Sequence, residues 1–489
     1  MLFNSLIFIL GFLPIVLLLY LGLEYFRKPL IAIIWLFIAS LFFYAWWNWA
    51  YVLLLLVSIV GNYLLGKALT RWHKKALLIA GISANLLLIG YYKYHNFFLE
   101  NLNYISGLQL PYADIFLPLG ISFFTFQQIA FLIDIYSKQV QVTRFSSYAL
   151  FISFFPQLIA GPIVHYQEIV PQMGQRRSLT VINQDLQIGL SIFLIGLFKK
   201  FAIADTLAIY ASPIFAQADS LVVLDGMIAW RATLAYAFQI YFDFSGYSDM
   251  AIGLGRLFGL RLPLNFFSPY KALNISDFWR RWHITLSRFL RDYLYIPLGG
   301  NQKGLLRTAV NLLMVMFLGG LWHGAGWNFI IWGMLHGFYL ACYQGFHNIR
   351  DYLPNLPTFI ARMMAWTITF IAVCIAWVFF RTETLPGALH MLQTMFDFKH
   401  WYFALQTEID IYLLLTGLIT LFLPNTWQLM REYSPSITPA PKTTSYMPML
   451  VNLHWRFNAT WAIFAGLLLA IIAILMVNGQ PTEFIYFQF

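Results

Sequence analysis

The sequence predicts an all-α membrane protein that crosses the bilayer many times, and its composition and hydropathy both lead to this fold class. Of its 489 residues, 60% are apolar, 19% are aromatic and only 10% are charged. Soluble domains carry about 25% charged residues, so an ordinary cytosolic protein is excluded. The aromatic content also excludes a disordered chain. Two cysteines, both in apolar runs, predict neither a disulfide framework nor a metal site.

Apolar runs that approach the length of a membrane span occur along the whole chain. A spanning helix needs about 20 mostly apolar residues. The candidate spans are 2–22, 30–46, 51–66, 76–92, 115–135, 148–163, 186–198, 228–244, 308–321, 327–343, 364–380, 410–424 and 457–477. Because 148–163 and 308–321 are short, we expect them to be re-entrant or to line a water-accessible cavity. We therefore expect about eleven crossings, in one membrane domain over residues 1–489.

Basic residues alternate between the connections and so predict an orientation. The first, third and fifth connections hold eight Lys and Arg residues, whereas 47–50 and 93–114 hold only Lys93. Cytoplasmic connections carry the excess of Lys and Arg, so the first helix is predicted to run from outside to inside. The stretch 431–456 holds three basic residues and the tail 478–489 holds none. We therefore expect the carboxyl terminus on the outer face.

The segment 271–307 concentrates positive charge. Its seven basic and two acidic residues give a local net charge of +5, half that of the chain. The pattern predicts one amphipathic helix, capped at Ser276 or Asn274 and ended by Pro297, with His283 among tryptophans and facing the protein. Its basic strip consists of Arg280, Arg281, Arg288 and Arg291. Such a strip suits anionic lipid headgroups and, compatibly, the docking of an anionic acyl donor.

A histidine in an apolar segment is the second informative feature. His323 lies in GGLWHGAGWNFIIWGMLHG, residues 319–337. Ionisable side chains inside membrane segments usually face a cavity or a polar partner, so His323 is either structural or part of a site. The surrounding glycines favour a site, because they leave space beside the ring. His336 is expected to be structural, and no spacing here resembles a zinc site.

The stretch QIYFDFSGYSDMAIGLGRLFG, residues 239–259, places Asp243 and Asp249 in apolar surroundings. Two interpretations remain open for these carboxyl groups. They line a polar cavity, or they are satisfied helix-end groups around Gly246.

Three long motifs together resemble those of a known family: YFDFSGYSDMAIGLG, FWRRWHITLSRFLRDYLYIPLGGN and LGGLWHGAGWNFIIWGMLHG. They resemble the core of the membrane-bound O-acyltransferases, above all the bacterial branch of alginate and peptidoglycan O-acetyltransferases. The teichoic-acid D-alanylation protein is a more distant likeness. The resemblance implies a ring of helices around a central tunnel that crosses the membrane, with a catalytic core at about 230–345 in this chain's numbering.

The resemblance also implies roles for single residues. The histidine of the LWHG motif is the family's catalytic residue, which is His323 here, and the histidine of the RRWH motif is His283. The aspartate of the IADTL motif is Asp205. A neutral imidazole at His323 is suited to take the proton of an attacking hydroxyl, while His283 would orient it or stabilise the oxyanion.

The chain ends in TEFIYFQF, which resembles the terminal aromatic–tyrosine motif proposed to relay acyl groups in these systems. The corresponding tyrosine is Tyr486. About nine residues separate it from the last helix and reach roughly 30 Å when extended, enough to enter a tunnel from outside. The alternative is an aromatic anchor at the membrane interface.

These features predict a bacterial inner-membrane enzyme that moves acetyl from cytosolic acetyl-CoA toward an envelope polysaccharide. The resemblance implies an esterase-like partner outside the cytoplasm, and anionic lipid and acyl donor at the cytosolic face. We expect no bound cofactor, no metal and no nucleic-acid partner. D-alanyl transfer to teichoic acid is the alternative within the family, and a transporter or scaffold is the alternative outside it.

Overall fold

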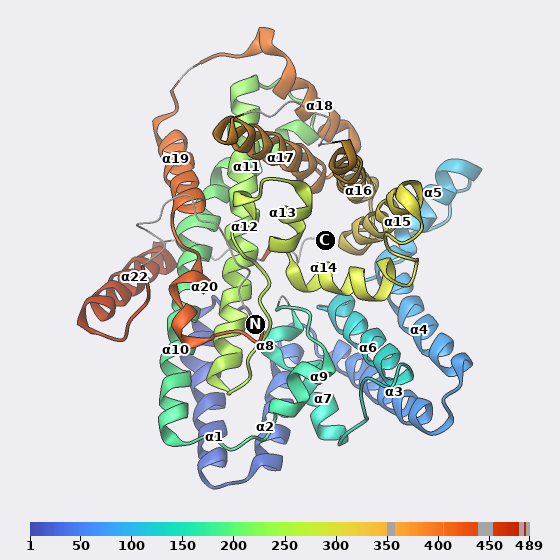
Figure 1. The fold of residues 1–489 in the computed structure, drawn as a ribbon, viewed down its shortest axis with the longest axis vertical. Helices are drawn as coiled ribbons and strands as arrows, with labels where there is room; N and C mark the ends of the chain where they lie inside the picture. The colour runs from blue at the N-terminus through green and yellow to red at the C-terminus, as the bar shows by residue number, and fades with distance from the viewer. Residues whose placement is uncertain (160, 350–356, 404, 439–452, 479–483, 486–489) are drawn as a thin grey trace. The chain divides into compact units, whose positions relative to one another are not determined.

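The computed structural model of this chain consists of helices and connecting loops (Figure 1). It describes residues 1–489 except 160, 350–356, 404, 439–452, 479–483 and 486–489. No strand occurs in the part of the chain that it describes, which agrees with the predicted all-α class. The chain forms two compact units. Whether the whole chain is one membrane domain stays a prediction.

Unit 1 comprises Met1–Leu197, Tyr247–Pro263 and Tyr433–Pro439. Its helices and helical turns are η1 (Ile7–Phe12), α1 (Leu13–Tyr25), α2 (Pro29–Ala45), α3 (Ala50–Trp72), α4 (Lys75–Ile89), η2 (Gly90–Tyr94), α5 (His95–Ser106), α6 (Ile121–Tyr136), α7 (Phe145–Ser153), α8 (Phe155–Leu158), α9 (Tyr166–Ile169), η3 (Val170–Gln172) and α10 (Leu179–Phe198).

Unit 2 comprises Phe198–Gly246, Leu264–Glu432 and Ala440–Phe489. Its helices and helical turns are η4 (Lys199–Asp205), α11 (Thr206–Asp219), η5 (Pro269–Lys271), α13 (Ile275–Arg281), α14 (Ile284–Leu290), η6 (Arg291–Tyr295), α15 (Gly304–His323), α16 (Trp327–Ile349), α17 (Thr358–Arg381), α18 (Leu385–Phe396), η8 (Phe398–His400), α19 (Thr407–Phe422), α20 (Thr426–Leu429) and α22 (Ala459–Asn478). Helix α12 (Gly226–Leu257) contributes its first part to unit 2 and its last part to unit 1.

Six helical stretches among the described residues are long and apolar enough to cross a membrane. They are Ile7–Tyr25, Ala50–Trp72, Lys75–Ser106, Gly304–His323, Thr358–Arg381 and Ala459–Val477. The chain is therefore a multi-pass membrane protein by length and composition. The more detailed expectation of about eleven crossings stays a prediction.

Two expectations about short apolar runs had different outcomes. The run 148–163 is broken, because α7 ends at Ser153 and α8 has only four residues, and its re-entrant or cavity-lining position stays a prediction. The run 308–321 belongs to the 20-residue helix α15, which is long enough to span, so the prediction that it is too short is wrong. The helix extends through polar residues at both ends, which the count of apolar residues left out.

Helix α12 removes one of the two interpretations that the sequence left open for the 239–259 stretch. It runs without interruption through Gly246, so Asp243 and Asp249 are not helix-end groups. A glycine inside a helix costs about 1 kcal/mol relative to alanine, but the buried residues on both sides of Gly246 keep the helix continuous.

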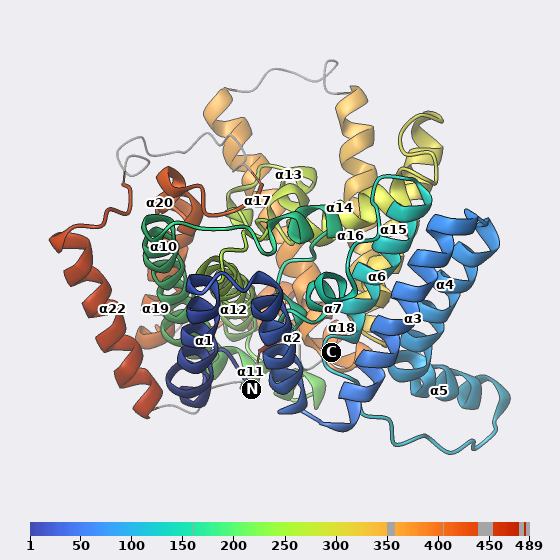
Figure 2. The same ribbon diagram turned by 90° about the horizontal axis from the view of Figure 1, so that it is seen from below.

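In unit 1, helices α3, α4 and α6 lie side by side (Figures 1 and 2). A buried polar cluster joins them. The amide of Asn62 donates to the side-chain oxygen of Gln128 at 2.7 Å, and the amide of Asn85 donates to the side-chain oxygen of Asn62 at 2.7 Å. Hydrogen bonds of this kind hold helices together in lipid, where the hydrophobic effect gives little drive for association.

In unit 2, α15 packs against α16 along a row of small residues. A Cβ atom on Gly320 would collide with the carbonyl oxygen of Phe329, and one on Gly333 would collide with that of Met316. Close backbone approach through glycine is typical of helix pairs in membranes. The pair therefore places His323, the last residue of α15, at a fixed position relative to α16.

We predict that Gly333→Ala lowers the stability of the folded protein. The added methyl group would overpack the α15–α16 contact, and overpacking typically costs about 1–3 kcal/mol. Thermal unfolding in detergent should show a melting temperature several degrees lower. Gly345→Ala is the matched control in the same helix, because nothing lies within 4 Å of a Cβ at Gly345. Equal melting temperatures for the two variants would contradict this account of the contact.

Candidate active site

The backbone breaks at His283, so the predicted single helix over this segment is wrong. Helix α13 ends at Arg281, and α14 begins at Ile284. His283 has φ +43°, a left-handed conformation that is uncommon for a residue other than glycine. The predicted cap at Asn274 is confirmed, since its side chain accepts from the backbone N–H of Asp277.

Hydrogen bonds from the loop segment 265–267 stabilise this break. The N–H of Phe267 donates to the carbonyl of Arg281 at 2.9 Å, and the N–H of Ile284 donates to the carbonyl of Asn265 at 2.9 Å. These bonds satisfy backbone groups at the end of α13 and the start of α14. Hydrophobic periodicity alone does not reveal such partners, because they come from outside the helix.

The hydrogen bonds of His283 indicate its tautomer. Its Nδ1 lies 3.1 Å from Oδ1 of Asn265, which also accepts from the hydroxyl of Thr285 at 2.9 Å. The backbone N–H of Thr285 points to the same atom at 3.4 Å. Because an N–H only donates, that atom is an oxygen, and Nδ1 of His283 must donate to it.

The proton on Nδ1 leaves Nε2 of His283 as the acceptor nitrogen. Nε2 is buried and has no hydrogen-bond partner among the described residues. His283 lies outside the six candidate spans, and burial lowers the pKa of its imidazole to about 3. A neutral ring with an open Nε2 accepts a hydrogen bond, so this geometry favours orienting a donor over donating to an oxyanion.

His323 is enclosed by aromatic rings. Its ring centroid lies 4.9 Å from Trp322, 4.8 Å from Trp332 and 5.2 Å from Phe380. The side chain is 3% exposed. Such surroundings exclude water and strengthen any electrostatic interaction made there.

Trp322 contacts both histidines. Its ring lies 6.0 Å from His283 and 4.9 Å from His323. The structure therefore brings the two sequence-predicted histidines to the same aromatic cluster in unit 2. His336 borders this cluster and accepts from the indole N–H of Trp279 at 3.3 Å, which fits the expected structural role.

A buried ion cluster joins two of the three predicted aspartates. The ammonium group of Lys200 lies 2.8 Å from Asp205 and 2.7 Å from Asp243. Lys200 and Asp205 belong to the π-helical turn η4, and Asp243 belongs to α12. Charged side chains at such depth need partners, so the lysine explains how both carboxylates are tolerated.

The carboxyl-terminal tail reaches this cluster. The backbone N–H of Ile485 donates to Oδ2 of Asp243 at 3.0 Å, and the ring of Phe484 lies 5.6 Å from that of Phe244. Phe484 is 0% exposed and Ile485 4% exposed. Phe244 also contacts His283, with 4.9 Å between ring centroids. The tail is therefore held inside unit 2, next to an aromatic residue that contacts the predicted site.

The remaining predicted residues divide into three groups. Asp249 is buried and belongs to unit 1. The basic residues do not form one helical strip, because the backbone breaks between Arg281 and Arg288. Tyr486 lies outside the described residues.

Pairing differs among the basic residues. Arg281 pairs with Asp277 at 2.9 Å, and Arg291 pairs with Asp292 at 2.7 Å. Arg280 and Arg291 are exposed, while Arg281 and Arg288 are half-buried. Within the described ranges, no group of three His, Cys, Asp or Glu residues has the arrangement of a metal site.

Sequence reasoning missed Lys200 and Asn265. Lys200 follows Lys199 in the KKFAIADTL motif, and two adjacent lysines usually indicate a charged surface. Only the separation of five residues between Lys200 and Asp205 indicated that the two side chains interact. Asn265 lies in a loop with no motif of its own, so its hydrogen bond to His283 was not accessible from the sequence.

Comparisons with known proteins agree with these motifs. A model of the membrane-bound O-acyltransferase family matches residues 41–385. A peptidoglycan O-acetyltransferase from Helicobacter pylori is 47% identical over 427 residues, which cover 81% of this chain and 80% of that protein. A probable alginate O-acetylase from Pseudomonas putida is 38% identical over 516 aligned residues, which cover 100% of both chains.

The comparisons give less support to the alternative functions, D-alanyl transfer and a transporter or scaffold. A teichoic acid D-alanyltransferase from Bacillus subtilis is 28% identical over 276 residues, 54% of this chain and 68% of that protein. This likeness is more distant than the two O-acetylating relatives. The family match and the names of its relatives favour an enzyme over a transporter or a scaffold. The chain belongs to the membrane-bound O-acyltransferase family and is a membrane O-acyltransferase.

Proposed function

We propose that this enzyme takes acetyl groups from cytosolic acetyl-CoA and delivers them across the membrane for O-acetylation of an envelope or exported polysaccharide. The names of its relatives support a polysaccharide of the peptidoglycan or alginate type. In this proposal the protein lies in the bacterial inner membrane with its carboxyl terminus outside, and about eleven crossings surround a central tunnel. An esterase-like partner outside the cytoplasm completes the transfer.

The proposed first step is acyl transfer to the tail. The phenol oxygen of Tyr486 attacks the thioester carbonyl carbon, a C–O bond forms and the C–S bond breaks. His323 takes the phenol proton and returns it to the departing CoA thiolate, so the thiol leaves neutral. A phenol needs an adjacent base to be a good nucleophile at neutral pH. His283, with an open Nε2, accepts a hydrogen bond and orients the reacting groups.

In the proposed second step an acceptor hydroxyl of the outer partner attacks the acetyl-tyrosine ester. The ester C–O bond breaks, the hydroxyl gains the acetyl group, and its proton returns to the phenol of Tyr486. The tyrosine is then ready for the next acetyl group. No net charge is left in the apolar site after a complete cycle, which suits a region where isolated charges are costly.

The tail contact is the observation that carries this proposal. Ile485, which immediately precedes Tyr486, donates its N–H to the buried carboxylate of Asp243. An interfacial anchor needs no buried carboxylate, whereas a relay needs the tail held inside the protein. Asp243 is in turn paired with Lys200. We therefore assign Asp205 and Asp243 as support for the tail.

Removal of the tyrosine hydroxyl tests the relay. Tyr486→Phe should reduce ester-linked acetyl on polysaccharide to background, because only the nucleophilic oxygen is lost. Base hydrolysis of purified polysaccharide and quantification of released acetate measure this. Tyr402→Phe, at an exposed tyrosine, is the matched control and should leave acetylation unchanged. Normal acetylation by Tyr486→Phe would overturn the relay.

The hydrogen bond that holds the tail is tested through the backbone at Ile485. Ile485→Pro removes the N–H that Asp243 accepts and leaves the Lys200–Asp243 ion pair untouched. We expect it to lower acetylation strongly, while Ile485→Ala, which keeps the N–H, retains most activity. Membrane abundance of both variants is matched by immunoblotting. Equal activity in the two variants would show that the hydrogen bond does not position the tail.

Donor docking is proposed for the basic segment, through Arg280, Arg281, Arg288 and Arg291. The double variant Arg280→Glu with Arg291→Glu, at the two exposed arginines, should raise KM for acetyl-CoA about tenfold with little change in kcat. The control is Lys303→Glu with Arg307→Glu, also exposed and equal in charge change. The same rise in KM for both pairs would refute specific docking, and no rise in either would refute an electrostatic role of the segment.

A further inference from the structure

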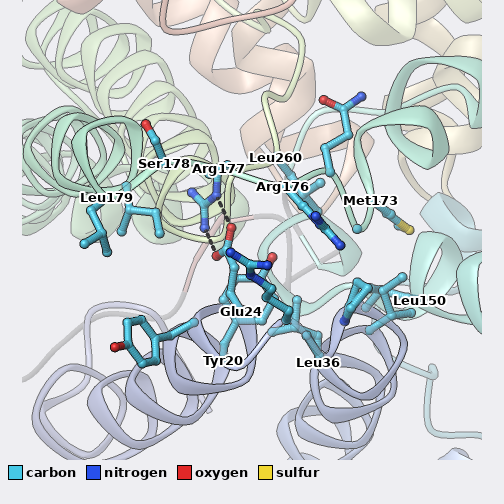
Figure 3. A pocket seen from close by; sticks show the side chains of 18 residues that line it. Tyr20, Glu24, Leu36, Leu150, Met173, Arg176, Arg177, Ser178, Leu179 and Leu260 are labelled. Carbon is cyan, nitrogen blue, oxygen red and sulfur yellow. Dashed lines mark hydrogen bonds and ion pairs between the residues drawn. The ribbon is translucent and has the colours of Figure 1, made fainter.

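Unit 1 holds a pocket of about 330 Å³ that is separate from the residues discussed above (Figure 3). Its wall combines the end of α1, the start of α2 and the segment Met173–Leu179, which leads into α10. A volume of this size is typical of small-molecule sites.

One arginine of the pocket is fully neutralised. Figure 3 shows Arg177 joined to Glu24, with distances of 2.9 Å from Nε and 2.6 Å from Nη2 to the carboxylate. Its Nη1 lies 2.9 Å from Asp185, which also pairs with Arg256 at 2.7 Å. The four largely buried side chains carry two positive and two negative charges. This network fixes the wall and leaves no charge for a ligand.

Two other arginines line the same pocket without such compensation. Arg27 and Arg176 are exposed, and among the described residues neither has a carboxylate within ion-pair distance. Figure 3 shows Arg176 beside the Arg177–Glu24 pair. The pocket therefore carries an excess of two positive charges. Guanidinium groups bind phosphate oxygens in a two-pronged geometry, which makes them suited to a phosphate ester.

One part of the pocket wall is apolar. The side chains that form this part are Ile33, Leu36, Leu150, Leu179, Ile182 and Leu260. Leu179 is 69% exposed, and on α1 Leu18 is 70% exposed. A ligand that satisfies this pocket has an anionic head and an apolar continuation.

The charge pattern predicts that this pocket lies at the cytosolic face. Arg27 and Lys28 form the first connection, which the positive-inside rule assigns to the cytosol. Basic pockets between membrane helices on that side are suited to anionic lipid headgroups. We propose that the pocket binds the phosphate headgroup of an anionic phospholipid, with Arg27 and Arg176 on the phosphate and the first part of an acyl chain along the apolar wall.

A soluble phosphate ester such as the donor's CoA shares the phosphate chemistry but does not need the apolar wall. The test therefore compares sources of phosphate. The purified protein is reconstituted in phosphatidylcholine nanodiscs, and its thermal stability is measured after addition of phosphatidylglycerol, inorganic phosphate or CoA. We expect a rise in melting temperature with phosphatidylglycerol only, because binding to the folded state stabilises it.

The double variant Arg27→Gln with Arg176→Gln should bind phosphatidylglycerol at least about tenfold more weakly, since each basic residue contributes to headgroup attraction. Native mass spectrometry of retained lipid gives a second readout. The control is Lys28→Gln with Lys138→Gln, which removes two exposed charges from predicted cytosolic connections outside the pocket.

Retained binding in the control and loss in the arginine pair would support the site. Equal binding by both double variants would overturn it, as would a stability shift with CoA or inorganic phosphate in place of phosphatidylglycerol. Because the pocket lies outside the proposed acyl-transfer residues, these outcomes do not depend on the relay.

Discussion

The ion cluster of Lys200, Asp205 and Asp243 is the interaction on which the arrangement of unit 2 depends. It joins η4 to α12, two parts of the chain separated by some forty residues, and through Asp243 it also holds the carboxyl-terminal tail. Lys200 lies between the two aspartates, and the N–H of Ile485 adds a donor to Asp243. Removal of one partner from a buried charged group typically costs about 3–5 kcal/mol. The cluster and the tail therefore stabilise each other, and tail binding is coupled to the fold of the core.

The second constraint is the break at His283. Because the chain turns there in a left-handed conformation, the imidazole lies inside the aromatic cluster while Arg280 and Arg291 remain exposed. A continuous helix would also separate an aromatic face from a basic face, but it would not bring Asn265 to Nδ1 of His283. That hydrogen bond sets the tautomer, and the tautomer decides that Nε2 accepts. Backbone geometry and proposed chemistry are thus linked through one asparagine.

The sequence alone predicted those features that depend on neighbouring residues in the chain. Apolar length predicted the helical membrane class, the Asn274 cap followed from residue type, and the motifs around His283 and His323 predicted the family. Long-range pairing was not accessible in this way: Lys200 with Asp243, Asn265 with His283 and Ile485 with Asp243 are each fixed by tertiary contacts. The continuity of α12 through Gly246 was left open by the sequence, and the length of α15 was wrongly predicted, because burial and polar helix ends outweigh local propensity. The roles of the two histidines and of Tyr486 stay predictions.

Direct detection of the acyl-enzyme tests the central claim of acyl transfer through the tail. Purified protein is incubated with isotopically labelled acetyl-CoA, digested under mildly acidic conditions that preserve esters, and its carboxyl-terminal peptide is examined by mass spectrometry. The account predicts labelled acetyl on Tyr486 in the unmodified protein and none in His323→Ala at matched abundance. Label on polysaccharide without any label on Tyr486, when the outer partner is supplied, would contradict it.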